Sequence, residues 1–215
     1  MTVEIFTVIK NAEYILPLYL EHYTSNFPGC KINIFDNGST DSSLKLCREA
    51  GCSINDFPDY VFSTNEGPLT DLKNNVWKGS KADWVIICDV DEILQINGED
   101  LLDLTEVDIV QFRGFNMVDI NDQKDPDLFT HGLSAGMYSK ACLFRPSIEE
   151  INYTPGAHGF EPDPKYKVSK FQYRLFHYNK SWFNLENFYV CHSYHPKDTV
   201  KDLYMKSLEK VRKLK

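Results

Sequence analysis

Residues 84–94 read Trp84-Val-Ile-Ile-Cys-Asp-Val-Asp-Glu-Ile-Leu94, and this stretch decides the fold class. The apolar run at 84–88 is typical of a strand that is buried on both faces, as the strands of parallel sheets are. Asp89 and Asp91 follow where this strand must end. Ligands of open α/β sheets bind where the strands end at their carboxyl edge. The stretch therefore predicts a buried parallel strand that delivers two carboxylates to a ligand site.

The sequence before residue 84 repeats a strand-then-helix pattern. Gly51 and Gly79 are placed to end two helices, and Asp41 is placed to cap the start of one. With a further strand at 83–88, the pattern predicts an α/β fold with a doubly wound, mostly parallel sheet. The expected strands are 3–9, 31–35 and 59–62, and the expected helices are 13–24, 41–50 and 70–78.

The pattern changes after residue 94. Strands without intervening helices are expected, separated by segments rich in Asp, Pro and Gly, and two helices are expected near the end of the chain. We find no repeat and no clear linker, so we expect a single domain over residues 1–215, with a ligand-binding half at 1–94 and a mixed half at 95–215. The expected strands are 107–118, 140–145 and 167–178, and the expected helices are 181–190 and 199–215.

Composition limits the partners of the chain. Its 215 residues carry 23 Lys and Arg against 31 Asp and Glu, a formal net charge of −8. Because binding to phosphate backbones needs a basic surface, we expect no nucleic-acid partner. We also expect no transmembrane segment, no signal peptide and a cytoplasmic location, since no apolar run approaches the roughly 20 residues of a bilayer span. The six cysteines form no Cys-x-x-Cys pair and are expected to be reduced thiols.

Polar side chains follow the predicted strands of the first half. Lys10 and Asn11 follow the first strand, Asp36 follows the second, and Asp89 and Asp91 follow the last. Two Asp one residue apart can both face a divalent cation if the backbone turns there, and carboxylates suit Mg²⁺ or Mn²⁺ beside a diphosphate. An isolated Asp-x-Asp is more often a loop or a helix cap, but the buried strand before it favours the metal here. The sequence therefore predicts a site for Mn²⁺ or Mg²⁺.

Three motifs in this order resemble the inverting glycosyltransferase family 2 and its relatives with the GT-A fold. They are Thr7-Val-Ile-Lys-Asn11, Ile34-Phe-Asp-Asn-Gly-Ser-Thr-Asp-Ser42 and residues 84–94. The resemblance is good over residues 3–94 and weaker beyond. It implies a Rossmann-like sheet flanked by helices, with an acceptor-side second half. It also implies metal-dependent, inverting hexosyl transfer from a nucleotide-diphosphate sugar, a UDP-sugar first among them, to a glycan or glycoprotein acceptor.

The resemblance also implies roles for residues of the first half. The backbone of Thr7 and Val8 would lie against the base, Asp36 would bond the base or ribose, Asp89 would meet the ribose, the sugar or the metal, and Asp91 would hold the metal. For Lys10 and Lys73 the alternative is a solvated surface lysine, which is the default for this residue type. In the helix that carries Lys73, the family usually has Ala-Arg-Asn, whereas this chain has Asp71-Leu-Lys-Asn74. Further candidates for donor binding are Lys10, Asn11, Asp71 and Lys73.

Short segments of the second half resemble later motifs of a related branch. They are Ser139-Lys-Ala-Cys-Leu-Phe-Arg-Pro146, Gly156-Ala-His-Gly159 and Leu175-Phe-His-Tyr178. His158, in a turn flanked by glycines, is a candidate metal or phosphate ligand, whereas His177 reads more readily as a satisfied core histidine. Inversion needs a general base, typically worth roughly 10²–10⁴ in rate. The candidates are Asp119, which ends a strand, Asp122, and Glu161 in a looser loop.

Other readings stay open. A closer resemblance, to the N-terminal domain of a multi-domain glycosyltransferase of a chlorella virus, implies further domains in a longer polypeptide and a place in the host cytoplasm. A haloacid-dehalogenase-type phosphatase also carries Asp-x-Asp after an apolar strand, but normally after its first strand. A non-catalytic domain that binds a nucleotide-sugar or a glycan would show binding without turnover.

Overall fold

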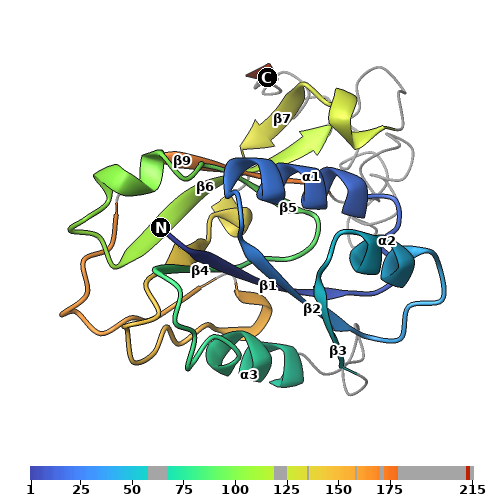
Figure 1. Cartoon of the computed structure of the whole chain (residues 1–215). Coiled ribbons are helices and arrows are strands. Elements are labelled where there is room, and N and C mark those ends of the chain that lie inside the picture. Colours follow the sequence, from blue (N-terminus) through green and yellow to red (C-terminus); the bar gives the residue numbers. More distant parts are fainter. Residues whose placement is uncertain are drawn as a thin grey trace, which may run out of the picture.

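Figure 1 shows a computed structural model of the chain, which describes residues 1–57, 67–118, 125–134, 136–157, 159–169, 172–178 and 212–213. Within these residues the strands join into a 10-stranded sheet. Helices α1 and α3 lie on opposite sides of this sheet (Figure 1). The chain therefore has the layered arrangement of an α/β protein.

The first half of the chain forms a parallel sheet. Its strand order is β3-β2-β1-β4, and each neighbouring pair runs in the same direction. The carboxyl ends of these strands consequently meet at one edge. The elements are β1 (Val3–Ile9), α1 (Leu16–Asn26), β2 (Lys31–Asp36), α2 (Ser43–Glu49), β3 (Ser53–Asp56), α3 (Gly67–Asn75) and β4 (Trp84–Ile87).

Strand β1 contributes alternate side chains to two buried clusters. Ile5 belongs to the cluster that contains Tyr19 and Tyr23 of α1, whereas Phe6 belongs to the cluster that contains Trp77, just after α3. Successive residues of a strand face opposite sides of the sheet. The sheet is thus buried on both faces, which agrees with the unbroken apolar character of β4.

The second half is mixed. Strand β8 pairs antiparallel to β4, β6 pairs antiparallel to β7 and β8, and β9 pairs parallel to β6 and antiparallel to β5. Strand β8 therefore joins the parallel half to β6, and β6 pairs in turn with β7 and β9. The elements are β5 (Glu92–Gln95), η1 (Asp100–Asp103), β6 (Ile109–Val118), η2 (Pro126–Leu128), β7 (His131–Ser134), η3 (Gly136–Tyr138), β8 (Ala141–Phe144), η4 (Pro155–Ala157), β9 (Tyr173–His177) and β10 (Arg212–Lys213).

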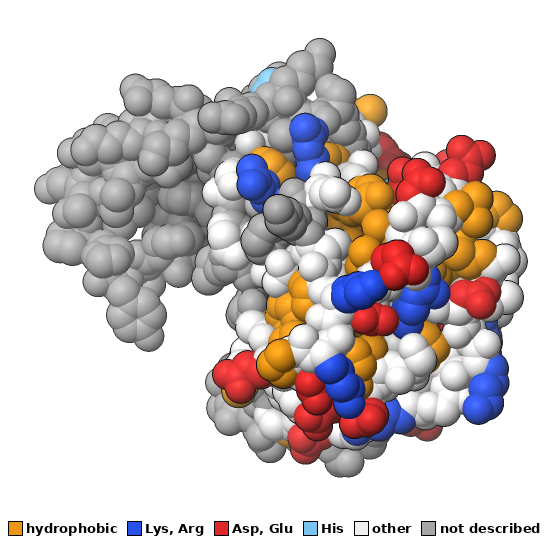
Figure 2. Space-filling view, turned by 90° about the vertical axis from the view of Figure 1, so that its left-hand side faces the viewer, with side chains coloured by type: hydrophobic (Ala, Val, Ile, Leu, Met, Phe, Trp, Pro, Cys, Tyr) orange, Lys and Arg blue, Asp and Glu red, His pale blue; other side chains and the backbone are white. Residues whose placement is uncertain are grey.

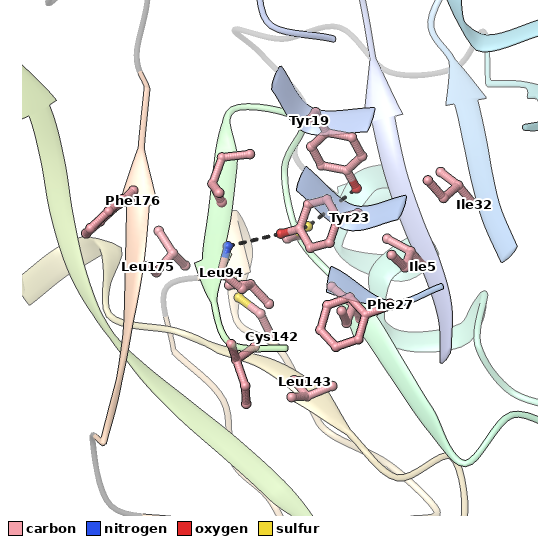
Figure 3. Packing of buried hydrophobic residues seen from close by; sticks show 14 of the residues in the cluster. Ile5, Tyr19, Tyr23, Phe27, Ile32, Leu94, Cys142, Leu143, Leu175 and Phe176 are labelled. Carbon is pink, nitrogen blue, oxygen red and sulfur yellow. Dashed lines mark hydrogen bonds between the residues drawn. The ribbon is translucent and has the colours of Figure 1, made fainter. Parts of the chain in front are cut away.

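Helix α1 fixes strand β5, which begins directly after the two aspartates. The Tyr23 hydroxyl accepts a hydrogen bond from the Leu94 backbone N–H at 3.2 Å, and it donates to the Glu92 carbonyl at 2.9 Å. Figure 3 shows Tyr23 reaching Leu94 from α1, within the buried cluster that includes Tyr19 and Phe27. Because buried backbone groups need partners, these bonds tie the segment after Asp91 to the core.

The predicted α/β class is confirmed, with its mostly parallel first half and mixed second half. The strands predicted at 3–9, 31–35, 83–88, 107–118 and 140–145 are present with small shifts of their ends. Helix α2 begins at Ser43 rather than at the predicted cap Asp41. The Asp41 carboxylate nevertheless accepts the Ser43 N–H at 2.9 Å, so it satisfies a free N–H of the first turn from just outside the helix.

Several expectations differ from the structure. The helix predicted over 199–215 is wrong at Arg212–Lys213, which form β10 and pair with β7, because strand pairing overrides helical spacing there. Among the described residues of the segment predicted as a strand at 167–178, Tyr173–His177 form β9. The third strand of the sheet is β3 at Ser53–Asp56, and β5 and β7 were not predicted. The strand expected at 59–62 and the helix expected at 181–190 lie outside the described residues.

The described part of the chain contains no helix that is long and apolar enough to cross a membrane. Five cysteines in that part, Cys30, Cys47, Cys52, Cys88 and Cys142, are free thiols, as expected from the sequence. The face shown in Figure 2 mixes basic and acidic side chains, with apolar side chains between them.

Candidate functional site at the end of strand β4

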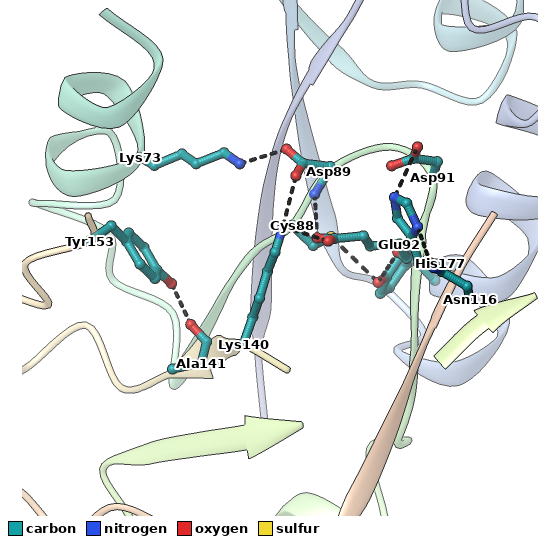
Figure 4. Close-up of polar contacts among 11 residues, drawn as sticks. Lys73, Cys88, Asp89, Asp91, Glu92, Asn116, Lys140, Ala141, Tyr153 and His177 are labelled. Atoms are coloured by element: carbon teal, nitrogen blue, oxygen red, sulfur yellow. Dashed lines mark hydrogen bonds and ion pairs between the residues drawn. The ribbon is translucent and has the colours of Figure 1, made fainter. Parts of the chain in front are cut away.

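The turn between β4 and β5 is closed by two hydrogen bonds between its ends. The Glu92 N–H donates to the Asp89 carbonyl at 3.0 Å, and the Asp89 N–H donates to Glu92 Oε2 at 3.0 Å. The Glu92 side chain is only 1% exposed. This closed turn fixes where Asp89 and Asp91 leave the sheet (Figure 4).

Two lysines hold the carboxylate of Asp89. Lys73 Nζ from α3 lies 2.5 Å from Asp89 Oδ1, and Lys140 Nζ lies 3.1 Å from Asp89 Oδ2 and 2.6 Å from Glu92 Oε1. Both ammonium groups are buried, whereas the Asp89 side chain is 34% exposed. Burial alone would raise the pKa of Asp89, but the two lysines outweigh burial and hold this pKa well below its usual range. Asp89 is therefore an ionised group that faces outward between two cations.

Helix α3 carries two predicted site residues, Lys73 and Asp71, of which the first is buried and the second is exposed. Lys73 is buried and paired with Asp89, so it is not the solvated lysine that is the default for this residue type. Asp71 is exposed, and its backbone carbonyl accepts a bond from the Asn75 side chain at 2.8 Å. The structure therefore brings Lys73, but not the Asp71 side chain, into the group of charges at the end of β4.

Asp91 faces a histidine on β9. Asp91 Oδ2 lies 3.5 Å from His177 Nε2, and the other ring nitrogen of His177 lies 2.7 Å from Asn116 Oδ1. Because an amide oxygen accepts, we assign a proton to Nδ1, and Nε2 is the ring atom that faces Asp91. The Tyr138 ring stacks on His177 with centroids 3.9 Å apart.

The charge state of Asp91 differs from that of Asp89. Burial raises the pKa of Asp91, and the neighbouring Asp89 and Glu92 raise it further, while His177 acts in the opposite direction. The two aspartates of the motif thus have opposite environments. Asp89 is already neutralised by lysines, whereas Asp91 would gain from an added positive charge.

The residues at the end of β4 fit a divalent cation in part. Across the described residues, no group of three or more His, Cys, Asp or Glu is gathered to hold a metal ion. Asp91 and His177 nevertheless supply a carboxylate oxygen and an imidazole nitrogen, both of which suit Mn²⁺. Ions of this class usually keep several waters and substrate phosphates as ligands. Two protein ligands therefore meet the needs of such an ion when a diphosphate is present.

The ends of β1 and β2 are joined by a network of side chains. Lys10 Nζ donates to Asn37 Oδ1 at 3.2 Å, and Asn11 Oδ1 accepts the Thr40 N–H at 2.7 Å. The Asp36 carboxylate accepts the N–H groups of Gly38 at 3.2 Å and Ser39 at 3.1 Å. Asp36 is thus held by its own turn, and any ligand at this edge would share its oxygens with the backbone.

Thr7 and Val8 lie inside the sheet at the same edge. Both are buried, and with Lys73 they line a small cavity of about 10 Å³ between β1, β4 and α3. A larger hollow of about 670 Å³ lies at the opposite, amino edge of the sheet, where Glu4, Lys31 and Ser80 line it. The larger hollow is therefore separate from the charged residues at the end of β4.

Of the predicted residues Asp119, Asp122, His158 and Glu161, the described part of the chain contains Glu161, and it is not part of this group. Glu161 is exposed, and its backbone exchanges hydrogen bonds with Asn152 across a turn. Asp119 and His158 lie outside the described residues, as does Asp122.

Sequence reasoning gave no site role to Lys140, Glu92, Asn116 or Tyr138, and it favoured a core role for His177. A charged residue at the start of an apolar strand, such as Glu92, was an available signal, because a buried carboxylate needs a partner. Lys140 stood in a short motif that was noted without a role. Nothing in the sequence pairs Asn116 with His177, which are 61 residues apart.

The sequence matches no protein-family model, and no curated protein matches it. Among solved structures, it is similar to S. aureus TarS, with a TM-score of 0.48 and 12% identity over 98% of this chain and 43% of TarS. The crystal structure of TarS 1-349 in complex with UDP-GlcNAc gives a TM-score of 0.47 and 13% identity over 98% of this chain and 72% of that one. The chain thus spans less than half the length of the longer TarS structure.

A further similarity is to glucosyl-3-phosphoglycerate synthase from Mycobacterium tuberculosis in complex with Mn²⁺, UDP and glucosyl-3-phosphoglycerate. Its TM-score is 0.35, with 15% identity over 54% of this chain and 44% of that one. Because these scores and identities are low, the description of the fold rests on the strand order of this chain and not on the similarities. A chlorella virus origin is not shown by these similarities.

Proposed function

We propose that this chain is a metal-dependent, inverting glycosyltransferase of the GT-A type. It would transfer a hexosyl group from a nucleotide-diphosphate sugar, with a UDP-sugar as the first candidate, to a glycan or glycoprotein acceptor. The observation that carries this proposal is the arrangement at the end of β4, where Asp91 faces His177 beside an Asp89 held by Lys73 and Lys140. We also propose that the chain acts as one domain, with further domains in a longer polypeptide.

Asp91 and His177 would hold Mn²⁺ or Mg²⁺ in this proposal. Their facing oxygen and nitrogen lie 3.5 Å apart, and Asn116 keeps the second ring nitrogen occupied. Such an outer partner fixes the ring and its tautomer for a metal. When bound, the cation supplies Lewis-acid stabilisation of a departing diphosphate. On the basis of the motif Gly156-Ala-His-Gly159, we also propose His158 as a further ligand of this cation.

The donor would lie across the carboxyl edge of the parallel strands. The backbone of Thr7 and Val8 and the carboxylate of Asp36 would contact the nucleotide, and Asp89 would bond its ribose or sugar. Lys73 provides a cation beside the place proposed for the diphosphate, and Lys10 and Asn11 stand at the end of β1. Asp71 would contribute least, because its side chain is exposed and belongs to no group of charges at this site.

We assign the general base to Asp119, ahead of Glu161. Asp119 follows β6 directly, and β6 also carries Asn116, which contacts His177. A single displacement needs the base on the face opposite the departing diphosphate, and this geometry inverts the anomeric carbon. Glu161 is the second candidate because it lies in an exposed turn, where less structure holds its carboxylate.

A thermal-shift panel tests the proposal. UDP-, GDP-, CMP- and dTDP-sugars would be added with and without Mn²⁺. A ligand at about 100 times its dissociation constant stabilises the folded state by about 2.7 kcal/mol. We expect one nucleotide class to raise the melting temperature, and we expect most of that rise to require Mn²⁺.

Asp91→Asn should remove most of the rise that depends on Mn²⁺. Asp103→Asn is the matched control, since Asp103 is an exposed acid of η1. A panel in which no nucleotide-sugar stabilises the wild type would contradict the proposal. Binding without any product in a transfer assay would support a non-catalytic binding domain, and release of phosphate from phosphate esters would support the phosphatase.

A further inference from the structure

Lys140 is a buried cation with two carboxylate partners. Its side chain is 4% exposed, and its Nζ lies 2.6 Å from Glu92 Oε1 and 3.1 Å from Asp89 Oδ2. A buried charge is costly unless it is paired and hydrogen-bonded. The two carboxylates outweigh the effect of burial and keep the pKa of Lys140 well above its usual value. Lys140 is therefore a fixed positive charge at the end of β4.

The backbone around Lys140 is held by strand β6. The Lys140 carbonyl accepts the Phe112 N–H at 2.8 Å, and the Ser139 hydroxyl accepts the Gly114 N–H at 3.1 Å. A side chain at Gly114 would collide with the backbone of Tyr138, so the two segments pack at the closest possible distance. The ammonium group consequently starts from a backbone that cannot easily shift.

The partners of Lys140 differ in what they do. Glu92 is fully buried, and its second oxygen closes the turn by accepting the Asp89 N–H. Asp89 is partly exposed, and each of its two oxygens meets a different lysine, Lys73 on one side and Lys140 on the other. A carboxylate held at both oxygens cannot rotate, whereas a carboxylate held at one oxygen can.

We infer that Lys140 is a positioning residue that, with Glu92, fixes the orientation of the Asp89 carboxylate toward the donor. This inference rests on the proposed function, in which Asp89 contacts the ribose or sugar. Loss of Lys140 would leave Glu92 without its cation and would free Asp89 to turn toward Lys73. The first effect lowers stability, and the second weakens donor binding without changing any group that touches the donor.

A double-mutant cycle separates these two effects. Lys140→Met removes the charge and leaves Glu92 buried and unpaired. Glu92→Gln keeps an oxygen to accept the Asp89 N–H but removes the negative charge. The double variant Lys140→Met/Glu92→Gln is therefore neutral and keeps the turn bond. Lys140→Arg is the conservative variant, and Lys165→Met is the control because Lys165 forms ion pairs at the surface, with a side chain that is 48% exposed.

Each variant would be measured by thermal denaturation and by calorimetric titration with the UDP-sugar and Mn²⁺, well below its melting temperature. We expect Lys140→Met to lose stability and the double variant to recover most of it. Donor affinity should stay at least about tenfold weaker in both variants, because the residue that holds the Asp89 carboxylate is gone and the loss of such supporting residues typically costs about 10–100-fold. Lys140→Arg should restore part of the affinity, and Lys165→Met should match the wild type.

Two results would overturn the inference in different ways. If the double variant regains both stability and donor affinity, Lys140 is only a structural ion-pair partner, and the proposed function stands. If the wild type binds none of the nucleotide-sugars, the proposed function fails and the positioning role fails with it.

Discussion

Replacing Tyr23 by Phe should weaken the strand that follows the two aspartates. The Tyr23 hydroxyl is buried, and it serves two backbone groups of β5, the Leu94 N–H at 3.2 Å and the Glu92 carbonyl at 2.9 Å. These groups lie on the edge of β5 that faces α1, since the other edge pairs with β9. Tyr23→Phe keeps the ring and removes only the hydroxyl, which besides these two bonds also contacts the Cys88 sulfur at 3.4 Å.

The expected cost follows from the backbone groups left without a partner. A buried donor or acceptor that loses its partner costs about 1–3 kcal/mol. Removal of the buried hydroxyl itself offsets part of this cost, so we expect a loss of about 2 kcal/mol in the free energy of unfolding. For a chain of this size, about 1 kcal/mol corresponds to about 2–4 °C, which gives a fall of about 4–8 °C in melting temperature.

Tyr19→Phe is the matched control. Tyr19 lies one turn earlier on the same helix and is equally buried, but its hydroxyl contacts the Cys88 sulfur at 3.6 Å and no backbone group of β5. Bonds to sulfur are weak, so we expect this variant to lose well under half as much stability. Both variants remove one buried hydroxyl from the same cluster, so their difference reports the two bonds to β5.

Urea unfolding would measure the global effect, with an unchanged dependence on urea as the sign that only stability changed. Hydrogen exchange would measure the local effect, because the Leu94 amide should exchange faster in Tyr23→Phe. Equal stability of the two variants, together with unchanged exchange at Leu94, would refute the claim that α1 anchors β5.

Three further predictions concern the site. Asp36→Ala should weaken calorimetric binding of UDP alone more than the surface control Glu99→Ala does, and equal affinities would make Asp36 a turn residue only. NMR of the product should show an inverted anomeric configuration. Asp119→Asn should keep donor affinity and lose turnover. If Asp119→Asn turns over almost normally and Glu161→Gln does not, Glu161 is the general base. Because the pKa of Asp89 is lowered below its ordinary 3.8 by its two lysines against the effect of burial, its contribution to stability is complete above that value and is lost as pH falls below it. Between about pH 5 and about pH 3, Asp89→Asn should therefore lose less stability in urea unfolding than the wild type, and equal losses would contradict this ion-pair account.

The sequence by itself predicted the elements whose apolar character is continuous. β4 is wholly buried and wholly apolar, and β1 and β2 are largely buried and carry apolar residues at most of their inner positions. β3 was missed because Ser-Ile-Asn-Asp is a polar edge strand, and β7 was missed because His-Gly-Leu-Ser has no pattern. Such strands form because they pair with a neighbouring strand, and the local sequence does not show which segments will pair.

The two aspartates were predicted because a motif at a strand end is a local feature. Their partners were not, because Lys140 lies 51 residues from Asp89 and reaches it through the pairing of β4, β8 and β6. His177 reaches Asp91 because β9 pairs with β5 in a register that sets it opposite Glu92. Strand register is chosen by the burial of whole faces and by distant hydrogen bonds. The sequence therefore determined which carboxylates stand at the sheet edge, and only the tertiary structure decided which cations and ring face them.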